Sequence, residues 1–355
     1  MSRFLSPTHG SLVPYVPGEQ PQVKKYIKLN TNESPFEPSP EVVKAINSDE
    51  VNKLNLYSDP EAKQLISAIA GNYGINTDRV LVGNGSDEVL AFAFHAFCDE
   101  NKGIAFPDVT YGFYPVFADF FGIKYKLVPL NSRLEIDIDD YREINDNVII
   151  ANPNAQTGTY LTPDKIEQLI AQNTDRLVII DEAYIDFGGQ SAVPLTDKYD
   201  NLLVIQTFSK SRNLAGARVG FAIGSPALIA DLNMMKFSFN PYNLNRLSIV
   251  AGAASMADKA YMQKCVSSII STRERTKAEL SSLGFTFPDS MANFILAQSD
   301  RISGKELYSR LHDAGIIVRY LGGERISNYN RITIGSDEQM DTLISQIKTI
   351  LGENL

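Results

Sequence analysis

Cysteine and histidine are scarce in this sequence, and their scarcity excludes two kinds of protein. Cys98 and Cys265 are the only cysteines, too few for the disulfide framework of a small secreted fold. The three histidines, His9, His95 and His312, do not have the spacing of zinc ligands. We therefore expect neither stabilising disulfides nor a metal site.

Long apolar runs and an excess of positive charge are also missing. No apolar run reaches the ~18 residues that a membrane-spanning helix needs. Residues 1–20 carry prolines and charges rather than the apolar centre of a secretory signal. Lys plus Arg number 33 and Asp plus Glu 42, a net charge of −9, which argues against a broad nucleic-acid or anionic-membrane surface. We expect a soluble, cytoplasmic protein that binds small molecules, without nucleic-acid or membrane partners.

The length and composition are those of an ordinary globular protein with two domains. The chain has 355 residues, of which 44% are hydrophobic and 21% charged. Prolines are concentrated in residues 1–40, which predicts an extended arm that packs on another part of the protein. We expect an N-terminal arm (1–45) that joins the small domain, a large domain (46–255) and a small C-terminal domain (256–355).

Short apolar runs alternate with helical patterns between about residues 60 and 225. Several runs are continuously apolar, as in strands that are buried on both faces. This alternation predicts an α/β fold with a mostly parallel central sheet. A long helix and a smaller α+β region are expected after residue 255. The expected strands are 80–82, 104–106, 125–128, 148–151, 177–180, 202–206 and 218–223 in the large domain, and 293–297, 316–319 and 331–334 in the small one.

Chemically useful residues follow two of these strands, at the end of the sheet where open α/β folds bind ligands. Lys210 comes after the strand 202–206. A lysine partly removed from water has a lowered pKa and can attack carbonyl groups, although an isolated lysine more often extends into solvent. Asp181 directly follows the strand 177–180. A buried carboxylate needs a partner, such as a helix N-terminus, a basic side chain or a protonated heteroaromatic nitrogen.

The predicted start of the helix near residue 86 is a candidate anion site. Backbone N–H groups of Ser86 and Asp87 would face an anion, which the helix dipole favours, although small residues begin many helices. Thr207, Ser209 and Arg218 could add donors, Arg218 in a bidentate manner.

Tyr111 follows the strand 104–106 and could stack on a planar ligand, although most of the 16 Tyr and 18 Phe should belong to the core. Together these residues provide an amine nucleophile, an anion cradle, a stacking ring and a carboxylate suited to a pyridinium. Pyridoxal 5′-phosphate requires this set of groups. The residues therefore favour an enzyme that uses this cofactor.

Seven motifs stand in order along the chain, at 28–35 (KLNTNESP), 56–60 (LYSDP), 84–88 (NGSDE), 110–114 (TYGFY), 181–184 (DEAY), 207–210 (TFSK) and 330–335 (NRITIG). With these motifs the chain resembles the fold-type I, class II aminotransferases that depend on pyridoxal 5′-phosphate, and within them the histidinol-phosphate aminotransferases. The resemblance extends over nearly the whole chain, and it implies a large domain that binds the cofactor.

The resemblance implies a role for each residue of the cofactor site. Lys210 would bind the cofactor covalently and then move a proton on the substrate. Asp181 would pair with the pyridine nitrogen, and Tyr111 would stack on the ring. Tyr184 would donate to the phenolic oxygen, together with an asparagine. The phosphate would be held by Ser86, Asp87, Thr207, Ser209 and Arg218.

The same resemblance implies a homodimer in which Tyr57 contacts the phosphate in the partner subunit's site. Arg331 would bind the α-carboxylate of glutamate. Arg319 would be a second substrate arginine, although an arginine on a strand can also form a surface salt bridge. Tyr15 would help to close the site. The implied reaction passes the amino group of glutamate to imidazole-acetol phosphate, giving histidinol phosphate and 2-oxoglutarate in histidine biosynthesis.

Two motifs depart from the family pattern. In the motif at 56–60, Ser58 stands where the family commonly has a proline, a change that we expect to be harmless. The family usually has Asn-Pro-Asn-Asn-Pro-Thr-Gly, whereas Ala155 and Gln156 stand here in place of the second Asn-Pro pair. The second asparagine normally contacts the phenolic oxygen of the cofactor. Asn154 is the nearest substitute, and we assign it to the cofactor site.

Several other functions share parts of this pattern. An aromatic-amino-acid aminotransferase would use the same machinery, and an O-phospho-amino-acid decarboxylase would also use two arginines. A transcription regulator that senses pyridoxal phosphate would need an additional DNA-binding domain, for which 355 residues leave no room. A nicotinamide dehydrogenase is disfavoured because the glycines at 83 and 85 lack the third glycine of the dinucleotide fingerprint.

Overall fold

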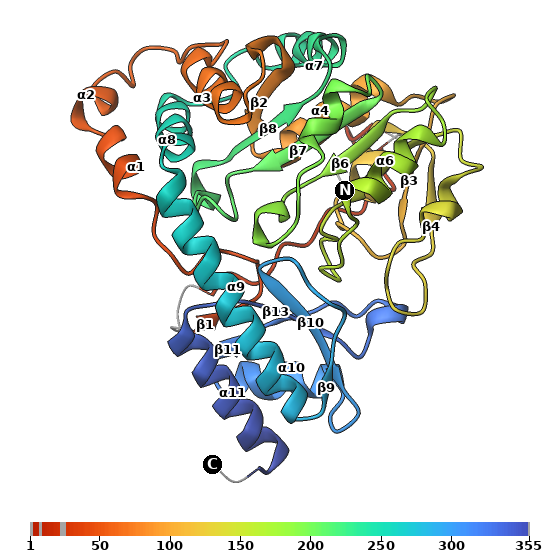
Figure 1. Ribbon diagram of the computed structural model, residues 1–355, viewed down its shortest axis with the longest axis vertical. Coiled ribbons are helices and arrows are strands. Elements are labelled where there is room, and N and C mark those ends of the chain that lie inside the picture. The colour runs from red at the N-terminus through yellow and green to blue at the C-terminus, as the bar shows by residue number, and fades with distance from the viewer. Residues whose placement is uncertain (1–2, 7–8, 22–25, 354–355) are drawn as a thin grey trace.

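The computed structural model describes residues 3–6, 9–21 and 26–353, so residues 1–2, 7–8 and 22–25 of the predicted arm lie outside the described residues. Its largest element is a seven-stranded sheet in the upper half of Figure 1. Only the β8 strand runs antiparallel to its neighbours, so the predicted mostly parallel sheet is confirmed. The order is β2 (Val80–Asn84), β8 (Val219–Ile223), β7 (Leu202–Thr207), β6 (Val178–Asp181), β5 (Asn147–Ala151), β3 (Ile104–Pro107) and β4 (Tyr125–Val128).

The central strands are apolar on both faces because helices cover both faces. Ile149 and Ile179 contribute to one hydrophobic core, and their neighbours Val148, Ile150 and Val178 contribute to the other, as the alternation of side chains along a strand requires. The first face is covered by α4 (Ser86–Phe97), α5 (Tyr114–Phe121) and α7 (Pro226–Phe239). The second is covered by α1 (Pro40–Ala45), α3 (Lys63–Tyr73), α6 (Pro163–Ala171) and α8 (Arg246–Ala257). The remaining helices of this part are α2 (Ser48–Val51) and the 3-10 helices Thr77–Arg79, Ile138–Tyr141, Ile185–Phe187, Val193–Asp197 and Ala215–Ala217.

A smaller, four-stranded antiparallel sheet lies below the first in Figure 1. Its order is β12 (Arg319–Tyr320), β13 (Asn330–Thr333), β10 (Phe294–Ser299) and β9 (Phe285–Thr286). Three helices pack around it, α9 (Lys259–Ser282), α10 (Gly304–Asp313) and α11 (Asp337–Leu351), and the 3-10 helix Glu324–Ile326 precedes β13.

The strand predicted at 316–319 is divided in the structure. Its first part, β11 (Ile316–Ile317), pairs in parallel with β1 (Ile27–Lys28), and its second part, β12, pairs with β13. The chain therefore changes its hydrogen-bonding partner at Val318, which is buried between the two pairs. Periodicity alone cannot show such a change, because the two parts are extended and separated by a single residue.

The N-terminal segment connects the two sheets. After β1, the Thr333 backbone N–H donates to the Leu29 carbonyl (3.0 Å), so this stretch lies along the smaller sheet. Helix α1 packs on α8 instead, with Val42 buried in the core of the larger sheet. In the described part of the chain, no helix has both the length and the apolarity needed to cross a bilayer.

Candidate active site

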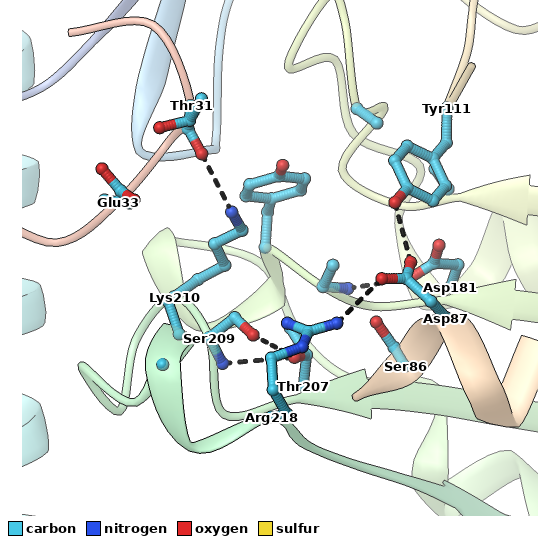
Figure 2. Close-up of a pocket in the computed structure, with 16 residues that line it drawn as sticks. Thr31, Glu33, Ser86, Asp87, Tyr111, Asp181, Thr207, Ser209, Lys210 and Arg218 are labelled. Carbon is cyan, nitrogen blue, oxygen red and sulfur yellow. Dashed lines mark hydrogen bonds and ion pairs between the residues drawn. The ribbon is translucent and has the colours of Figure 1, made fainter. Parts of the chain in front are cut away.

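A cavity of about 340 Å³ lies at the carboxyl ends of β6 and β7, beside the start of α4 (Figure 2). Ligands bind at this end of the strands in open α/β sheets. The cavity brings together most of the residues predicted for the cofactor site. Its lining consists of Thr31, Glu33, Ser86, Asp87, Tyr111, Ala151, Ala155, Asp181, Ala183, Tyr184, Thr207, Ser209, Lys210, Ala215, Gly216 and Arg218.

Lys210 extends into the cavity from the loop after β7 (Figure 2). Its Nζ donates to the Thr31 carbonyl at 3.3 Å and lies 5.7 Å from the centre of the Tyr184 ring. Burial, together with the positive charge of Arg331, lowers the pKa of Lys210 to about 8. A useful fraction of the amine is therefore neutral near pH 7–8, which is the form that attacks carbonyl carbon.

Asp181 ends β6 and is 3% exposed. Its carboxylate accepts hydrogen bonds from the Tyr114 hydroxyl (2.8 Å) and the Ala183 backbone N–H (3.2 Å). Burial raises its pKa to about 6, so it is mostly ionised at neutral pH. Within the described part of the chain no cationic side chain pairs with it. A carboxylate in this state is suited to a cationic group of a ligand.

An anion cradle forms where α4 begins. Gly85 precedes the helix with a φ of +81° and provides no side-chain cap, so the first N–H groups of the helix remain available. A methyl group on Gly85 would lie 2.5 Å from Arg218 Nη2, so glycine is needed for the close approach. Arg218 Nη2 in turn lies 2.9 Å from an Asp87 carboxylate oxygen.

Two hydroxyl groups complete this cradle. Thr207 Oγ1 donates to Ser209 Oγ at 3.0 Å and accepts from the Ser209 backbone N–H at 3.2 Å. Both side chains line the cavity on the side of Arg218 (Figure 2). Helix N–H groups, a guanidinium and two hydroxyls together are a donor set for a phosphate.

Two tyrosines stand on different sides of the cavity. Tyr111 donates to Asp87 at 2.7 Å and packs edge-on against Tyr114, with ring centres 5.5 Å apart, which fixes its ring at the cavity surface. The Tyr184 hydroxyl accepts a hydrogen bond from Asn32 Nδ2 at 3.0 Å, so its own proton can be donated into the cavity. Asn32 is held by Thr333, whose Oγ1 donates to Asn32 Oδ1 at 3.1 Å.

Arg331 approaches the site from β13 without lining the cavity. Its Nη1 donates to the Ala155 carbonyl (2.9 Å) and to Gln156 Oε1 (3.0 Å). The guanidinium lies 5.2 Å from the centre of the Phe294 ring, and its Nε is buried without a hydrogen-bond partner. A buried donor without a partner is costly, and it indicates a place for an acceptor from a ligand.

Arg319 and Tyr15 lie further from the cavity. Arg319 donates from Nη1 to the Pro17 carbonyl (3.3 Å) and from Nη2 to the Val16 carbonyl (3.0 Å), so it binds the N-terminal arm. Tyr15 packs on Phe113 with ring centres 4.8 Å apart. The structure therefore brings both residues to the arm rather than into the cavity.

Asn154 does not reach the cavity, contrary to its assignment to the cofactor site. Its Nδ2 donates to the Val109 carbonyl (2.9 Å), and its Oδ1 accepts from the backbone N–H groups of Gln156 (2.9 Å) and Thr157 (3.1 Å). The side chain is thus used to hold its own turn. Tyr57 also lies outside this chain's cavity; it is 80% exposed and stacks on Tyr242 at 4.6 Å.

Sequence reasoning gave no role to three residues of the motif at 28–35 that shape the site. Thr31 and Glu33 line the cavity, and Glu33 is ion-paired with Lys28. Asn32 anchors Tyr184 and has a φ of +55°, a left-handed conformation that asparagine tolerates better than most residues. The motif itself was visible in the sequence, but its contacts with Tyr184 and Thr333 were not.

Comparison with known proteins gives a consistent set of relatives. Residues 24–347 match the family Aminotransferase class I and II. The histidinol-phosphate aminotransferase of Brachyspira hyodysenteriae is 50% identical over 352 residues, which cover 99% of each chain. That of Clostridium beijerinckii is 47% identical, over 100% of this chain and 99% of the other. The structure of the histidinol-phosphate aminotransferase of Sinorhizobium meliloti, in complex with pyridoxal-5′-phosphate, has a TM-score of 0.90 at 24% identity over 99% of this chain and 98% of that one, and it shares the fold.

Proposed function

The chain belongs to the aminotransferase class I and II family, and from this premise we propose that it transfers an amino group between glutamate and imidazole-acetol phosphate in histidine biosynthesis. Pyridoxal 5′-phosphate is the cofactor of the proposed reaction. The observation that carries the proposal is the presence of Lys210 and Asp181 in one cavity. One is an amine whose pKa burial lowers to about 8, and the other is a buried carboxylate suited to a cation.

The cavity residues fit this cofactor. The N-terminus of α4, Thr207, Ser209 and Arg218 would hold its phosphate, and the missing Cβ of Gly85 leaves room for Arg218 beside it. Tyr111 would lie against the planar ring. When bound, the cofactor supplies an aldehyde that takes up amino groups and an aromatic ring that withdraws electrons from the substrate's α-carbon.

The chain's own residues would each hold or move a proton. Asp181 would keep a proton on the ring nitrogen, because a buried carboxylate with two neutral donors is stabilised by a cation. Tyr184, held by Asn32, would donate its hydroxyl proton to the phenolic oxygen. Lys210 would bind the cofactor through Nζ and, when the substrate amine replaces it, carry the proton of the substrate's α-carbon. A pKa of about 8 suits this task near neutral pH.

The substrates of the proposed reaction both carry anions. Arg331 would bind the α-carboxylate of glutamate through the guanidinium edge that contains its unpaired Nε. Arg319 would bind the second anion after releasing the arm carbonyls of Val16 and Pro17, and Tyr15 on the arm would then help to close the site. Closure of this kind excludes water from the cavity.

The active unit of the proposed enzyme is a homodimer in which Tyr57 reaches the partner subunit's phosphate. The exposed aromatic pair at this position supports this: Tyr57 is 80% exposed, and Tyr242, on which it stacks, is 45% exposed. Sedimentation across a concentration series tests the dimer. Recovery of activity on mixing Tyr57→Ala with Lys210→Ala protein tests shared sites, because one site of a mixed dimer would then contain both native residues.

The division into an arm (1–45), a cofactor-binding domain (46–255) and a small domain (256–355) is part of the same proposal, as is a cytoplasmic location. The separate hydrogen-bonding networks of the larger and smaller sheets support two domains, and the pairing of β1 with β11 supports an arm that joins the small one. Helix α1, at the end of the arm, packs on α8 of the large domain. Limited proteolysis followed by mass spectrometry tests it: cuts should gather near residues 45 and 255.

A spectral titration of the purified holoprotein tests the reaction. Histidinol phosphate at low concentration should remove the visible band of the lysine-bound cofactor, and 2-oxoglutarate should restore it. Equal removal of the band by phenylalanine would favour an aromatic-amino-acid aminotransferase. Release of carbon dioxide from an O-phospho amino acid would favour a decarboxylase. A protein that takes up no cofactor would contradict the assignment altogether.

A further inference from the structure

In this chain the side chain of Gln156 forms a hydrogen bond that holds the guanidinium of Arg331. Gln156 stands where the family usually has a proline, which has no side-chain acceptor. Its Oε1 accepts a hydrogen bond from Arg331 Nη1 at 3.0 Å, and the Ala155 carbonyl accepts from the same nitrogen at 2.9 Å. Both hydrogens of Nη1 are therefore bound by the protein.

The opposite edge of the guanidinium stays available. Arg331 Nε is buried without a partner, and Nη2 has no hydrogen-bond partner among the described residues. Nε and Nη2 form one of the parallel donor pairs that match a carboxylate. The Phe294 ring, 5.2 Å from the guanidinium, limits tilting of its plane.

Gln156 is itself fixed to the larger sheet. Its backbone N–H donates to Asn154 Oδ1 (2.9 Å), and Asn154 Nδ2 donates to the Val109 carbonyl (2.9 Å). The chain of bonds from Val109 through Asn154 and Gln156 thus reaches Arg331 on β13 of the smaller sheet. Gln156 also lines a second cavity of about 400 Å³, together with Asp108 and Arg325.

We propose that Gln156 is a positioning residue that turns the Nε–Nη2 edge of Arg331 toward the carboxylate of the amino donor. This inference rests on the proposed function, because it assigns a carboxylate substrate to Arg331. A shorter side chain at 156 would leave the Ala155 carbonyl as the remaining protein acceptor for Nη1. The guanidinium would then sample orientations that bind a carboxylate less well, while the chemistry at Lys210 would be unaffected.

Two reagents that capture the cofactor test this inference in the holoenzyme. Aminooxyacetate carries a carboxylate, whereas hydroxylamine has the same reactive group without one. In Gln156→Ala the second-order rate of capture by aminooxyacetate should fall about five- to tenfold, the size of the net contribution of one typical hydrogen bond. The rate with hydroxylamine should stay at the wild-type value. Glutamate should show a raised KM with kcat retained, and calorimetry should show weaker binding of glutarate.

Two further variants separate positioning from loss of structure. Gln156→Glu places a carboxylate against Arg331. It should slow capture by aminooxyacetate, and weaken the binding of glutarate, more than Gln156→Ala does. Gln172→Ala is the matched control, because Gln172 Oε1 also accepts from an arginine, Arg176 Nη2 at 3.2 Å, away from the cavity. It should leave the ratio of the two capture rates unchanged.

The outcomes distinguish the two levels of the argument. If neither reagent reacts with the wild-type protein, the proposed function is overturned, and this inference with it. A wild-type protein that favours aminooxyacetate, together with an unchanged rate ratio in Gln156→Ala, would overturn the role of Gln156 alone. An equal fall with both reagents would also overturn it, since it would indicate general damage to the site.

Discussion

The cavity has two sides that are built in different ways. One side, which we call the floor, lies at strand ends and helix starts of the larger sheet and in the loop between β7 and β8. It consists of Ser86, Asp87, Asp181, Thr207, Ser209, Lys210 and Arg218. The other side, which we call the wall, is lined by Thr31 and Glu33. We include in the wall Asn32, Arg319 and Arg331, which come from the N-terminal segment and the smaller sheet and do not themselves line the cavity. Floor residues are placed by neighbouring strands, whereas Asn32 and Thr333 of the wall side are bonded across 301 positions of sequence.

This difference in construction matches a difference in task. The floor holds groups that any amino donor would need, namely the amine of Lys210, the carboxylate of Asp181 and the anion cradle. The wall holds two arginines in unlike states, Arg331 partly buried near the cavity and Arg319 bound to the arm. Substitutions in the floor should therefore affect all substrates alike, and substitutions in the wall should affect substrates according to their anions.

Lys210→Ala should have the largest effect. Transamination of every donor should fall at least about a thousandfold, because the nucleophile and the proton carrier are both lost. Borohydride reduction and peptide mass spectrometry check the position of the adduct. Lys236→Met is the matched control, since Lys236 is also buried (2% exposed) but donates to the Pro60 carbonyl outside the cavity. An adduct that persists in Lys210→Ala would assign the nucleophile to another lysine.

Asp181→Asn should lower kcat about a hundred- to a thousandfold for every donor, because a neutral amide cannot keep a proton on the ring nitrogen. Stopped-flow measurement of each half-reaction checks this. Glu182→Gln is the control next in sequence. Glu182 is 2% exposed, and burial raises its pKa to about 7, but it accepts from Ser191, Ala192 and Gln206 on the side away from the cavity. Equal losses in both variants would show that burial, not contact with the cofactor, decides the effect.

Arg331→Lys should raise the KM for glutamate about a hundredfold, since a lysine cannot reproduce the paired donors of the guanidinium. Arg319→Ala should have a smaller effect, about tenfold, because Arg319 must first leave the arm carbonyls. Steady-state kinetics with glutamate and with histidinol phosphate check both. Equal losses for the two substrates in Arg319→Ala would show that Arg319 does not discriminate between their anions.

Arg331→Gln should also have a small effect on the floor, through the pKa of Lys210. The positive charge of Arg331 adds to burial in lowering the pKa of Lys210 to about 8. Without that charge the pKa should rise, so less amine is neutral at pH 7–8 and capture of pyridoxal phosphate should slow about two- to threefold. The rate of capture by cofactor-free protein, measured against pH, checks this: its midpoint should move to higher pH. Arg325→Gln, whose guanidinium binds Asp108 and Leu130, should leave the midpoint unchanged.

The floor could be predicted from the sequence because local signals specify it. A continuously apolar strand that ends in Asp181, and another followed by Lys210, give both the element and the end of the sheet. The start of α4 was marked in the same way by the glycine before Ser86. Parallel neighbours then bring these ends together without further information.

For the wall, the sequence allowed the residues to be predicted but not their contacts with one another. Gln156 and Arg331 are bonded across 175 positions, and no local pattern indicates that contact. The contacts of Asn154 could not be predicted either, for a related reason. An asparagine near a strand end can bind a ligand or form hydrogen bonds within its own turn. Here Asn154 Nδ2 donates to the Val109 carbonyl and its Oδ1 accepts from the Thr157 N–H, so the side chain stabilises the turn.

The parallel pairing of β1 with β11 sets an order of events during synthesis. A chain that leaves the ribosome from its N-terminus can assemble residues 80–223 into the larger sheet before Ile316 and Ile317 exist. Ile27 and Lys28 are made first among all the strands but must wait for the last part of the chain, and closing so long a loop is slow. In a nascent chain, the residues that would bind the cofactor phosphate can therefore assemble before the residues of the wall, on which substrate selection would depend.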